Sequence, residues 1–136
     1  MSFALDERLA ADALIVGDMT LTRVLLMNDA RWPWLILVPR LEGVVELTDL
    51  DAADRTQLIE EAASAAGFLK ARAGAHKINL GALGNIVRQL HLHVVARAPG
   101  DPAWPGPVWG YGAARRYGER EAAALIEAAR LALTTG

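Results

Sequence analysis

Two histidines stand one residue apart in "RQLHLHVVAR", residues 88–97, a run that is otherwise mostly aliphatic. Imidazole is largely neutral near pH 7 because its unperturbed pKa is about 6.5, so His91 and His93 can attack phosphorus, bind a metal ion or donate hydrogen bonds. Successive side chains of a β-strand point to opposite faces of the sheet. We therefore expect Gln89, His91 and His93 to form a polar ladder on one face, with the aliphatic residues between them on the core face.

A metal centre is the less favoured use of this histidine pair. Zinc sites need roughly three or four protein ligands, and the chain offers one further histidine, His76, and no cysteine. Residues 77–100 contain no aspartate or glutamate that would complete a ligand set. We predict no metal site, and partly exposed structural histidines stay open as an alternative to catalysis.

Covalent phosphoryl chemistry needs a nucleophile and hydrogen-bond donors in one place. Attack by imidazole would form a phospho-histidine intermediate and divide one difficult displacement into two easier ones. The segment "NLGALGN", residues 79–85, lies just upstream. Its glycines allow close approach of the backbone, and the side-chain amides of Asn79 and Asn85 can donate to phosphoryl oxygens.

Four segments are predicted to form the sheet that positions these residues. Residues 22–29 and 32–40 are aliphatic and β-branched runs separated by a turn that contains Asp and Pro, which predicts two consecutive paired strands. Residues 76–81 and 88–97 give two more strands around the glycine-bearing segment. The pattern favours a mostly antiparallel sheet in an α+β architecture.

Two helices and one long loop complete the expected elements. A helix is predicted between Leu50 and Gly74, with Thr48 or Asp49 as N-cap. A second helix is predicted over residues 119–134, and the proline- and glycine-rich residues 99–112 form a loop. The apolar faces of the two helices are expected to comprise Leu58, Ile59, Ala62, Ala66 and Leu69, and Ala122, Leu125, Ile126, Ala129 and Leu133.

Length and composition exclude several classes of protein. The 136 residues are 53% hydrophobic and 22% charged, which predicts one globular domain over residues 1–136 rather than a disordered chain. A net charge of −2 gives no basic surplus for nucleic acid. The N-terminus has no secretory pattern and no apolar run approaches the roughly 18 to 20 residues that span a membrane, so we expect a cytoplasmic protein without a membrane partner.

The run "QLHLHVV" resembles the signature of the histidine triad (HIT) superfamily of nucleotide hydrolases and transferases, in which three histidines alternate with hydrophobic residues. Gln89 stands where the first of the three histidines would be. Further segments resemble the family in the same order: "MND", "LILVPR", "NLGALGN", "VVAR" and "AWPG". The resemblance covers about residues 20–110 and identifies the chain as a variant of the triad.

The resemblance implies a HIT-like fold, with a five-stranded antiparallel sheet and two main helices. It also implies a homodimer in which two such sheets form one continuous sheet, and a nucleotide site on the face that carries the signature. No organic cofactor is implied. A divalent cation can accompany a polyphosphate substrate without a dedicated protein cage.

Site residues follow position by position from the same resemblance. His91 would be the nucleophile, and His93 would donate a hydrogen bond to the phosphate or the leaving group. Gln89 cannot ionise, so it would keep an orienting role only. The nucleotide-binding set would be Asn28 at the ribose and Asn79 and Asn85 at the phosphates, to which strand alternation adds Arg97 as a phosphate candidate.

Two further features bear on substrate recognition. Ile86 stands where the phosphoramidase branch of the family has a serine, which predicts a different route of leaving-group protonation. Trp104 and Trp109, in the loop, are expected to pack over the core rather than contact substrate.

These features together predict a nucleotide hydrolase that cleaves at the α-phosphorus of nucleoside 5′-phosphoryl compounds, such as dinucleoside polyphosphates, through a nucleotidyl-histidine intermediate. The alternative is a nucleotide-binding or sensing module with little or no turnover.

Overall fold

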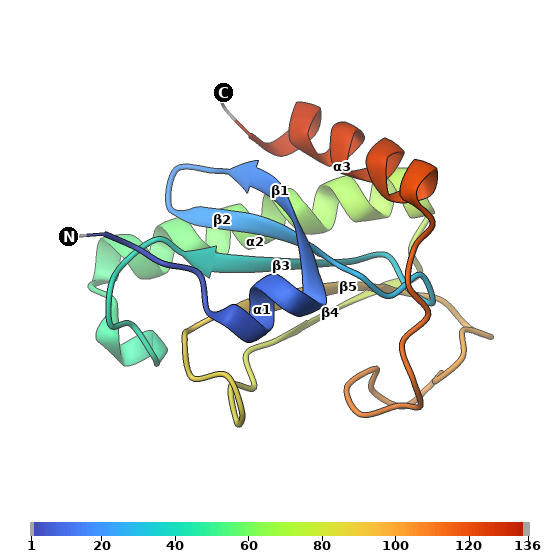
Figure 1. Cartoon of the computed structure of the whole chain (residues 1–136), viewed down its shortest axis with the longest axis horizontal. Helices are drawn as coiled ribbons and strands as arrows, with labels where there is room; N and C mark the ends of the chain where they lie inside the picture. Colours follow the sequence, from blue (N-terminus) through green and yellow to red (C-terminus); the bar gives the residue numbers. More distant parts are fainter. Residues whose placement is uncertain (1, 135–136) are drawn as a thin grey trace.

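The computed structural model describes residues 2–134, and its centre is one five-stranded antiparallel sheet (Figure 1). The strand order is β1-β2-β3-β5-β4, so β3 lies in the middle and β1 and β4 are the edges. The sheet expected from the family resemblance is thereby confirmed. The strands are β1 Ala13–Asp18, β2 Thr22–Met27, β3 Trp34–Pro39, β4 Lys77–Gly81 and β5 Leu92–Arg97.

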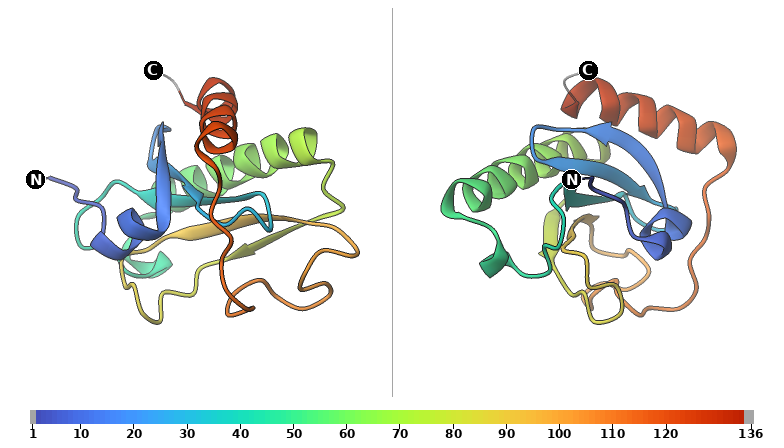
Figure 2. Two further views of the ribbon diagram at one scale, coloured as in Figure 1. Left: turned by 45° about the vertical axis from the view of Figure 1, so that its right-hand side comes forward. Right: turned by 60° about the vertical axis from the view of Figure 1, so that its left-hand side comes forward.

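The two long helices lie on one side of the sheet, and the long loops lie on the other (Figure 2). The helices are α1 Glu7–Asp12, α2 Ala52–Ala73 and α3 Glu119–Leu133, with a short 3-10 helix over Leu47–Asp49. The second predicted helix is confirmed as α3. No helix within residues 2–134 has both the length and the apolar character needed to cross a membrane.

Strand β3 is buried along its whole length because both of its faces are covered. Leu35 and Leu37 pack against α2 and α3 in one core cluster. Trp34 and Ile36 point the other way and pack with Val95 and residues of the loops in a second cluster. This two-sided burial explains the nearly continuous apolar run in the sequence.

The N-terminus of α2 differs from the prediction. Asp51 is the N-cap, and its side chain accepts a hydrogen bond from the Asp54 amide. Asp49 instead stabilises the preceding 3-10 helix, where its carboxylate accepts from the amides of Val45 and Glu46. The predicted Thr48 or Asp49 cap is therefore wrong by at least two residues, because a short extra helix precedes α2. Gly74 ends the helix with a φ of 62°.

The buried face of α2 is rotated relative to the expected one. Ile59 is 55% exposed, which corrects its predicted place on the apolar face. Glu61 is buried in its place, and its carboxylate accepts from the amides of Leu21 and Thr22 and from the Thr22 hydroxyl. A helix face that includes Leu58 continues through positions three and four residues later, and Glu61 occupies the first of these. Hydrophobic spacing alone could not reveal a carboxylate that holds the β1–β2 turn.

The signature strand is shorter than predicted. Strand β5 begins at Leu92, so residues 88–91 lie outside it and His91 directly precedes it. The predicted alternation holds within β5, where Val94 faces the helices and His93 faces the loops. In the sheet register His93 lies opposite Ile36 of β3 and Gly81 of β4.

Candidate active site

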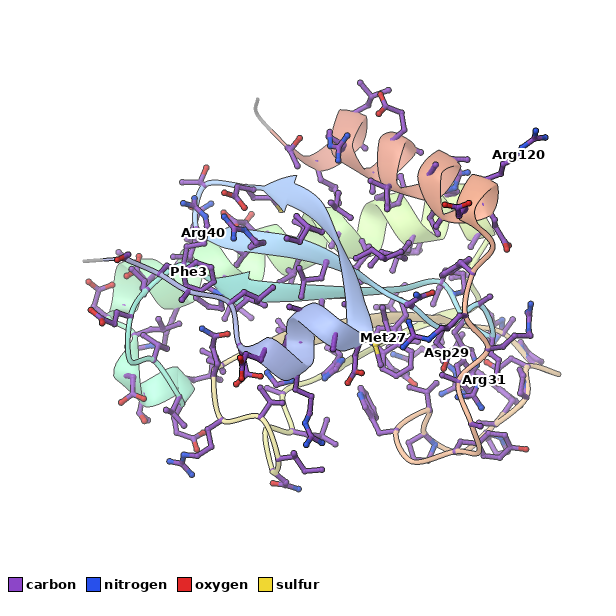
Figure 3. The ribbon with its side chains drawn as sticks, in the orientation of Figure 1. Phe3, Met27, Asp29, Arg31, Arg40 and Arg120 are labelled. Atoms are coloured by element: carbon purple, nitrogen blue, oxygen red, sulfur yellow. The ribbon has the colours of Figure 1, made fainter. Side chains whose placement is uncertain are left out.

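A pocket of about 390 Å³ opens on the loop side of the sheet and contains both histidines of the signature. Its walls come from α1, the end of β2, the middle of β3, the start of β5, the loop between β4 and β5, and the loop that follows β5. Figure 3 shows Met27, one of the lining residues, beside the C-terminal end of α1. The lining residues are Arg8, Leu9, Asp12, Met27, Ile36, Leu83, Gly84, Asn85, Ile86, Val87, His91, His93 and Trp109.

His91 has a fixed tautomer. Its Nδ1 lies 2.6 Å from the backbone oxygen of Gln89. A carbonyl oxygen can only accept, so in the neutral ring Nδ1 carries the proton and Nε2 has the free lone pair. His91 is 6% exposed. His91 therefore offers an unprotonated nitrogen without needing a separate base.

His93 has the opposite tautomer. The Trp34 indole Nε1 donates to His93 Nδ1 at 3.0 Å, so the proton of the neutral ring is on Nε2. Burial, and secondly the neighbouring His91, lower the pKa of His93 to about 4. The two imidazole centroids are 5.0 Å apart. The pair thus places one acceptor nitrogen and one donor nitrogen next to each other.

The depressed pKa of His93 predicts a loss of stability in mild acid. Above pH 6.5 this ring is mostly neutral in both the folded and the unfolded chain. Below pH 6.5 the unfolded chain binds a proton that the folded chain accepts only near pH 4, so the free energy of unfolding falls. The loss reaches about 2.5 kcal/mol at pH 4.5. Urea unfolding at pH 7 and pH 4.5 measures the loss, which should be smaller in His93→Gln than in wild type. An equal loss in both proteins would contradict the assignment to His93.

Two glycines shape the pocket walls. A Cβ atom at Gly81 would lie 2.9 Å from Cη2 of Trp109, so the absence of a side chain lets this indole pack over β4. The Trp109 ring also contacts His93, with centroids 5.5 Å apart. Gly84 has a φ of 68°, which favours glycine in the loop before the signature. Trp109 packs against the core as expected, and it also lines the pocket.

The Gln89 side chain binds the N-terminal segment rather than the histidines. Its side-chain oxygen accepts from the Asp6 amide, and its side-chain nitrogen donates to the Ala4 carbonyl oxygen. The side chain thus ties the N-terminal segment, which leads into α1, to the segment before β5. Only its backbone oxygen contacts His91. Gln89 acts on His91 through the main chain, which any residue at this position can supply.

Replacing Gln89 with alanine tests this division of roles. Gln89→Ala removes two hydrogen bonds but keeps the carbonyl that fixes His91. We expect a loss of about 1 to 2 kcal/mol in the free energy of unfolding, measured by urea denaturation. The imidazole 15N shifts of His91 should stay unchanged in the NMR spectrum, and a changed His91 tautomer would show that the side chain matters directly.

Asn79 and Arg97 lie outside the pocket and bind each other. Arg97 Nη1 donates to Asn79 Oδ1 at 2.8 Å. The other guanidinium nitrogens donate to both carboxylate oxygens of Asp101 and to the Gly106 carbonyl oxygen. The ion pair holds the pKa of Asp101 well below its usual range. The structure does not bring these two predicted nucleotide-binding residues to the histidines.

Asn28 has a partner outside the pocket as well. It follows Met27, which lines the pocket, but its Oδ1 accepts from the Tyr117 amide in the segment before α3. The adjacent Asp29 carboxylate accepts from Arg31, and Figure 3 shows these two side chains together beside that segment. These contacts anchor the chain that leads into α3.

Asn85 and the histidines are the predicted site residues that the pocket brings together. Ile86 also lines the pocket and is 74% exposed. Trp104 packs elsewhere, on the Arg97 guanidinium at 5.6 Å, in agreement with the expected packing role.

Three residues of α1 were missed by the sequence analysis. Arg8 and Asp12 are exposed, four residues apart on the same helix face, and Leu9 is buried between them. Helix α1 has six residues, too few for a periodic pattern of apolar residues to be recognised. The capping residue Asp6, whose side chain accepts from the Arg8 amide, was the available sign that a helix starts here.

A metal site and a second cavity were the other candidate features in the described part of the chain. Among residues 2–134, no group of three or more His, Cys, Asp or Glu side chains is arranged to hold a metal ion. A second cavity of about 300 Å³ lies between α2 and α3, on the opposite side of the sheet, and contains no histidine.

Comparisons with known proteins identify the family. A model of the HIT domain matches residues 8–100. Three solved structures are similar over nearly the whole chain: histidine triad proteins from Sinorhizobium meliloti (50% identity, 96% of this chain and 97% of that one, TM-score 0.93), Marinobacter aquaeolei (44%, 98% and 97%, 0.94) and Bradyrhizobium japonicum (41%, 98% and 99%, 0.94). No curated protein matches closely enough to carry a comparison.

The fold, the placement of the histidine pair and these matches agree, and the chain belongs to the histidine triad family. The family includes nucleotide hydrolases and transferases, so membership indicates a nucleotide-binding protein.

Proposed function

We propose that this chain hydrolyses nucleoside 5′-phosphoryl compounds, such as dinucleoside polyphosphates, by nucleophilic attack of His91 on the α-phosphorus. The observation that carries the proposal is the tautomer of His91, whose Nδ1 donates to the Gln89 carbonyl so that Nε2 is free. This nitrogen belongs to a side chain that lines a pocket of about 390 Å³, a size that fits a mononucleotide.

The reaction takes place in two displacements. In the first, His91 Nε2 bonds to the α-phosphorus while the bond from phosphorus to the leaving oxygen breaks. In the second, water attacks the same phosphorus and breaks the P–N bond, releasing a nucleoside monophosphate and returning His91 to its starting form. His93 Nε2–H and the Asn85 amide donate to the phosphoryl oxygens as charge develops there.

The polar groups of the pocket favour a particular leaving group. A neutral imidazole such as His93 donates hydrogen bonds but is a weak acid, and Ile86 has no proton to offer. A leaving group that departs as a stable anion needs no proton. We therefore propose phosphate and polyphosphate leaving groups over amines. A divalent cation would arrive with such a substrate, and no organic cofactor takes part.

Arg8 and Asp12 suggest how the nucleotide is oriented. Both line the pocket beside the apolar side chains of Leu9, Met27 and Ile36. These apolar residues suit a base, the carboxylate suits hydroxyl or amino donors of the nucleoside, and the guanidinium suits an anion.

Trapping the covalent intermediate tests the proposal. The protein is mixed with a diadenosine tetraphosphate or an adenosine phosphoramidate, quenched in alkali, where phospho-histidine survives, and digested for mass spectrometry. We expect an adenylyl group on His91 and faster turnover of the polyphosphate. Turnover with an adduct on another residue would refute the assignment of the nucleophile.

The second candidate is a nucleotide-binding module without turnover. It is favoured by the position of the Gln89 side chain, which contributes nothing to the histidine pair. Wild-type protein that binds AMP at micromolar concentration and turns over neither substrate would establish this candidate.

We also propose that the protein is a homodimer formed through β4. This strand is an edge of the sheet, and Leu80 on it is 52% exposed, whereas α3 packs against β1 at the opposite edge. A free edge strand can pair with a second copy and extend the sheet. Light scattering coupled to gel filtration measures the mass in solution.

A further inference from the structure

We propose that Trp34 is a positioning residue for His93, because its indole N–H holds the His93 ring in the tautomer that carries the proton on Nε2. The consequence for catalysis rests on the function proposed above. The tautomer itself does not, because it is a property of the resting protein.

The contact leaves little freedom to either ring. An indole nitrogen can only donate, so its 3.0 Å hydrogen bond requires a lone pair on His93 Nδ1. Trp34 is 3% exposed and His93 is 7% exposed, so water competes poorly for the bond. Trp109 meets the Trp34 ring edge to face, with centroids 6.3 Å apart, and limits its rotation.

The sheet register brings Trp34 to His93. Ile36 of β3 lies directly opposite His93 of β5, and Trp34 is two residues before Ile36 on the same face. Trp34 is therefore a diagonal neighbour of His93, a separation that a long aromatic side chain can bridge. A smaller residue at the start of β3 would leave Nδ1 without a partner.

The hydrogen bonds around the two histidines fix opposite tautomers. The Gln89 carbonyl accepts from His91 Nδ1, whereas the Trp34 indole donates to His93 Nδ1. His91 consequently presents a lone pair at Nε2, and His93 presents an N–H. If both rings had the same tautomer, the histidine pair would present two N–H donors and no nucleophile at Nε2, or two lone pairs and no donor. Trp34 is what makes these two identical side chains different.

The test compares Trp34→Phe with Trp32→Phe. Both changes remove an indole N–H from the same buried cluster, but Trp32 does not contact His93. The 15N shifts of the histidine rings at pH 7 report which nitrogen carries the proton. We expect the Nε2–H tautomer in wild type and in Trp32→Phe, and a mixture of tautomers in Trp34→Phe. Turnover should fall about tenfold in Trp34→Phe with KM little changed, less than the loss on removing a transition-state donor outright.

A second measurement needs no variant and covers the case in which Trp34→Phe does not fold. A scalar coupling through the hydrogen bond, between Nε1 of Trp34 and Nδ1 of His93, should be detectable in uniformly 15N-labelled wild type. An Nδ1–H tautomer in wild type, or an unchanged tautomer in folded Trp34→Phe, would overturn the proposal. A changed tautomer with unchanged turnover would overturn its catalytic part. If wild type turns over no substrate, the proposed function fails, while the NMR result still decides the role of Trp34.

Discussion

Replacing His91 with alanine should reduce hydrolysis of a dinucleoside polyphosphate by about 10⁴-fold or more, as expected for loss of a covalent nucleophile. The reason is local: His91 Nε2 is the lone pair that its surroundings leave free, since Nδ1 is used by the Gln89 carbonyl. His93 cannot replace it, because Trp34 holds its proton on Nε2. Steady-state release of AMP, followed by chromatography, measures the effect.

His76→Ala is the matched control for this experiment. His76 is exposed, packs edge to face on Trp104 with centroids 5.8 Å apart, and does not line the pocket. It should therefore keep wild-type turnover. AMP binding by His91→Ala should remain within about threefold of wild type, since the nucleophile acts in the transition state rather than in ground-state binding. Equal turnover by His91→Ala and wild type would eliminate His91 as the nucleophile.

The sequence could predict the face of the sheet that carries the chemistry. Alternation placed His93 opposite the aliphatic core residues, and the structure confirms this, because Val94 faces the helices and His93 faces the pocket. Strand alternation depends only on backbone geometry, so it can be read without knowing the neighbours. The same rule failed at Gln89, since the strand begins only at Leu92 and the residue lies outside it.

The sequence could not predict the hydrogen-bond partners of the polar side chains. Asn28, Asn79 and Arg97 have the right types for binding a nucleotide, but each has a side-chain partner within the protein. Asn28 accepts from the Tyr117 amide and Asn79 accepts from Arg97, which also donates to Asp101 and Gly106 in the loop after β5. Hydrogen bonds between segments distant in the sequence depend on the tertiary fold and leave no local pattern. The resemblance still supplies the nucleotide-binding roles as predictions, which substitutions of these residues can test.

Arg97→Met should lower the free energy of unfolding by about 3 to 5 kcal/mol, the usual cost of removing one member of a buried ion pair. Arg97 is 2% exposed and the Asp101 side chain is 10% exposed. The substitution leaves the Asp101 carboxylate without its cationic partner, although the amides of Ala98 and Ala103 still donate to it, and it takes the donor away from the Asn79 and Gly106 oxygens. Urea denaturation at pH 7 measures the loss.

Arg23→Met is the matched control, because Arg23 makes the same kind of two-point contact with Asp18 at the surface. These side chains are 29% and 38% exposed, so water replaces the lost contact and the expected loss is at most about 1 kcal/mol. The double variant Arg97→Met/Asp101→Asn should regain part of the stability, since it removes the unpaired charge. A large stability loss in Arg97→Met, a small one in Arg23→Met and partial recovery in the double variant would assign Arg97 to holding the loop after β5. The AMP affinity of folded Arg97→Met should then stay within about twofold of wild type. A small stability loss with AMP binding weakened about tenfold or more would instead assign its guanidinium to the phosphate.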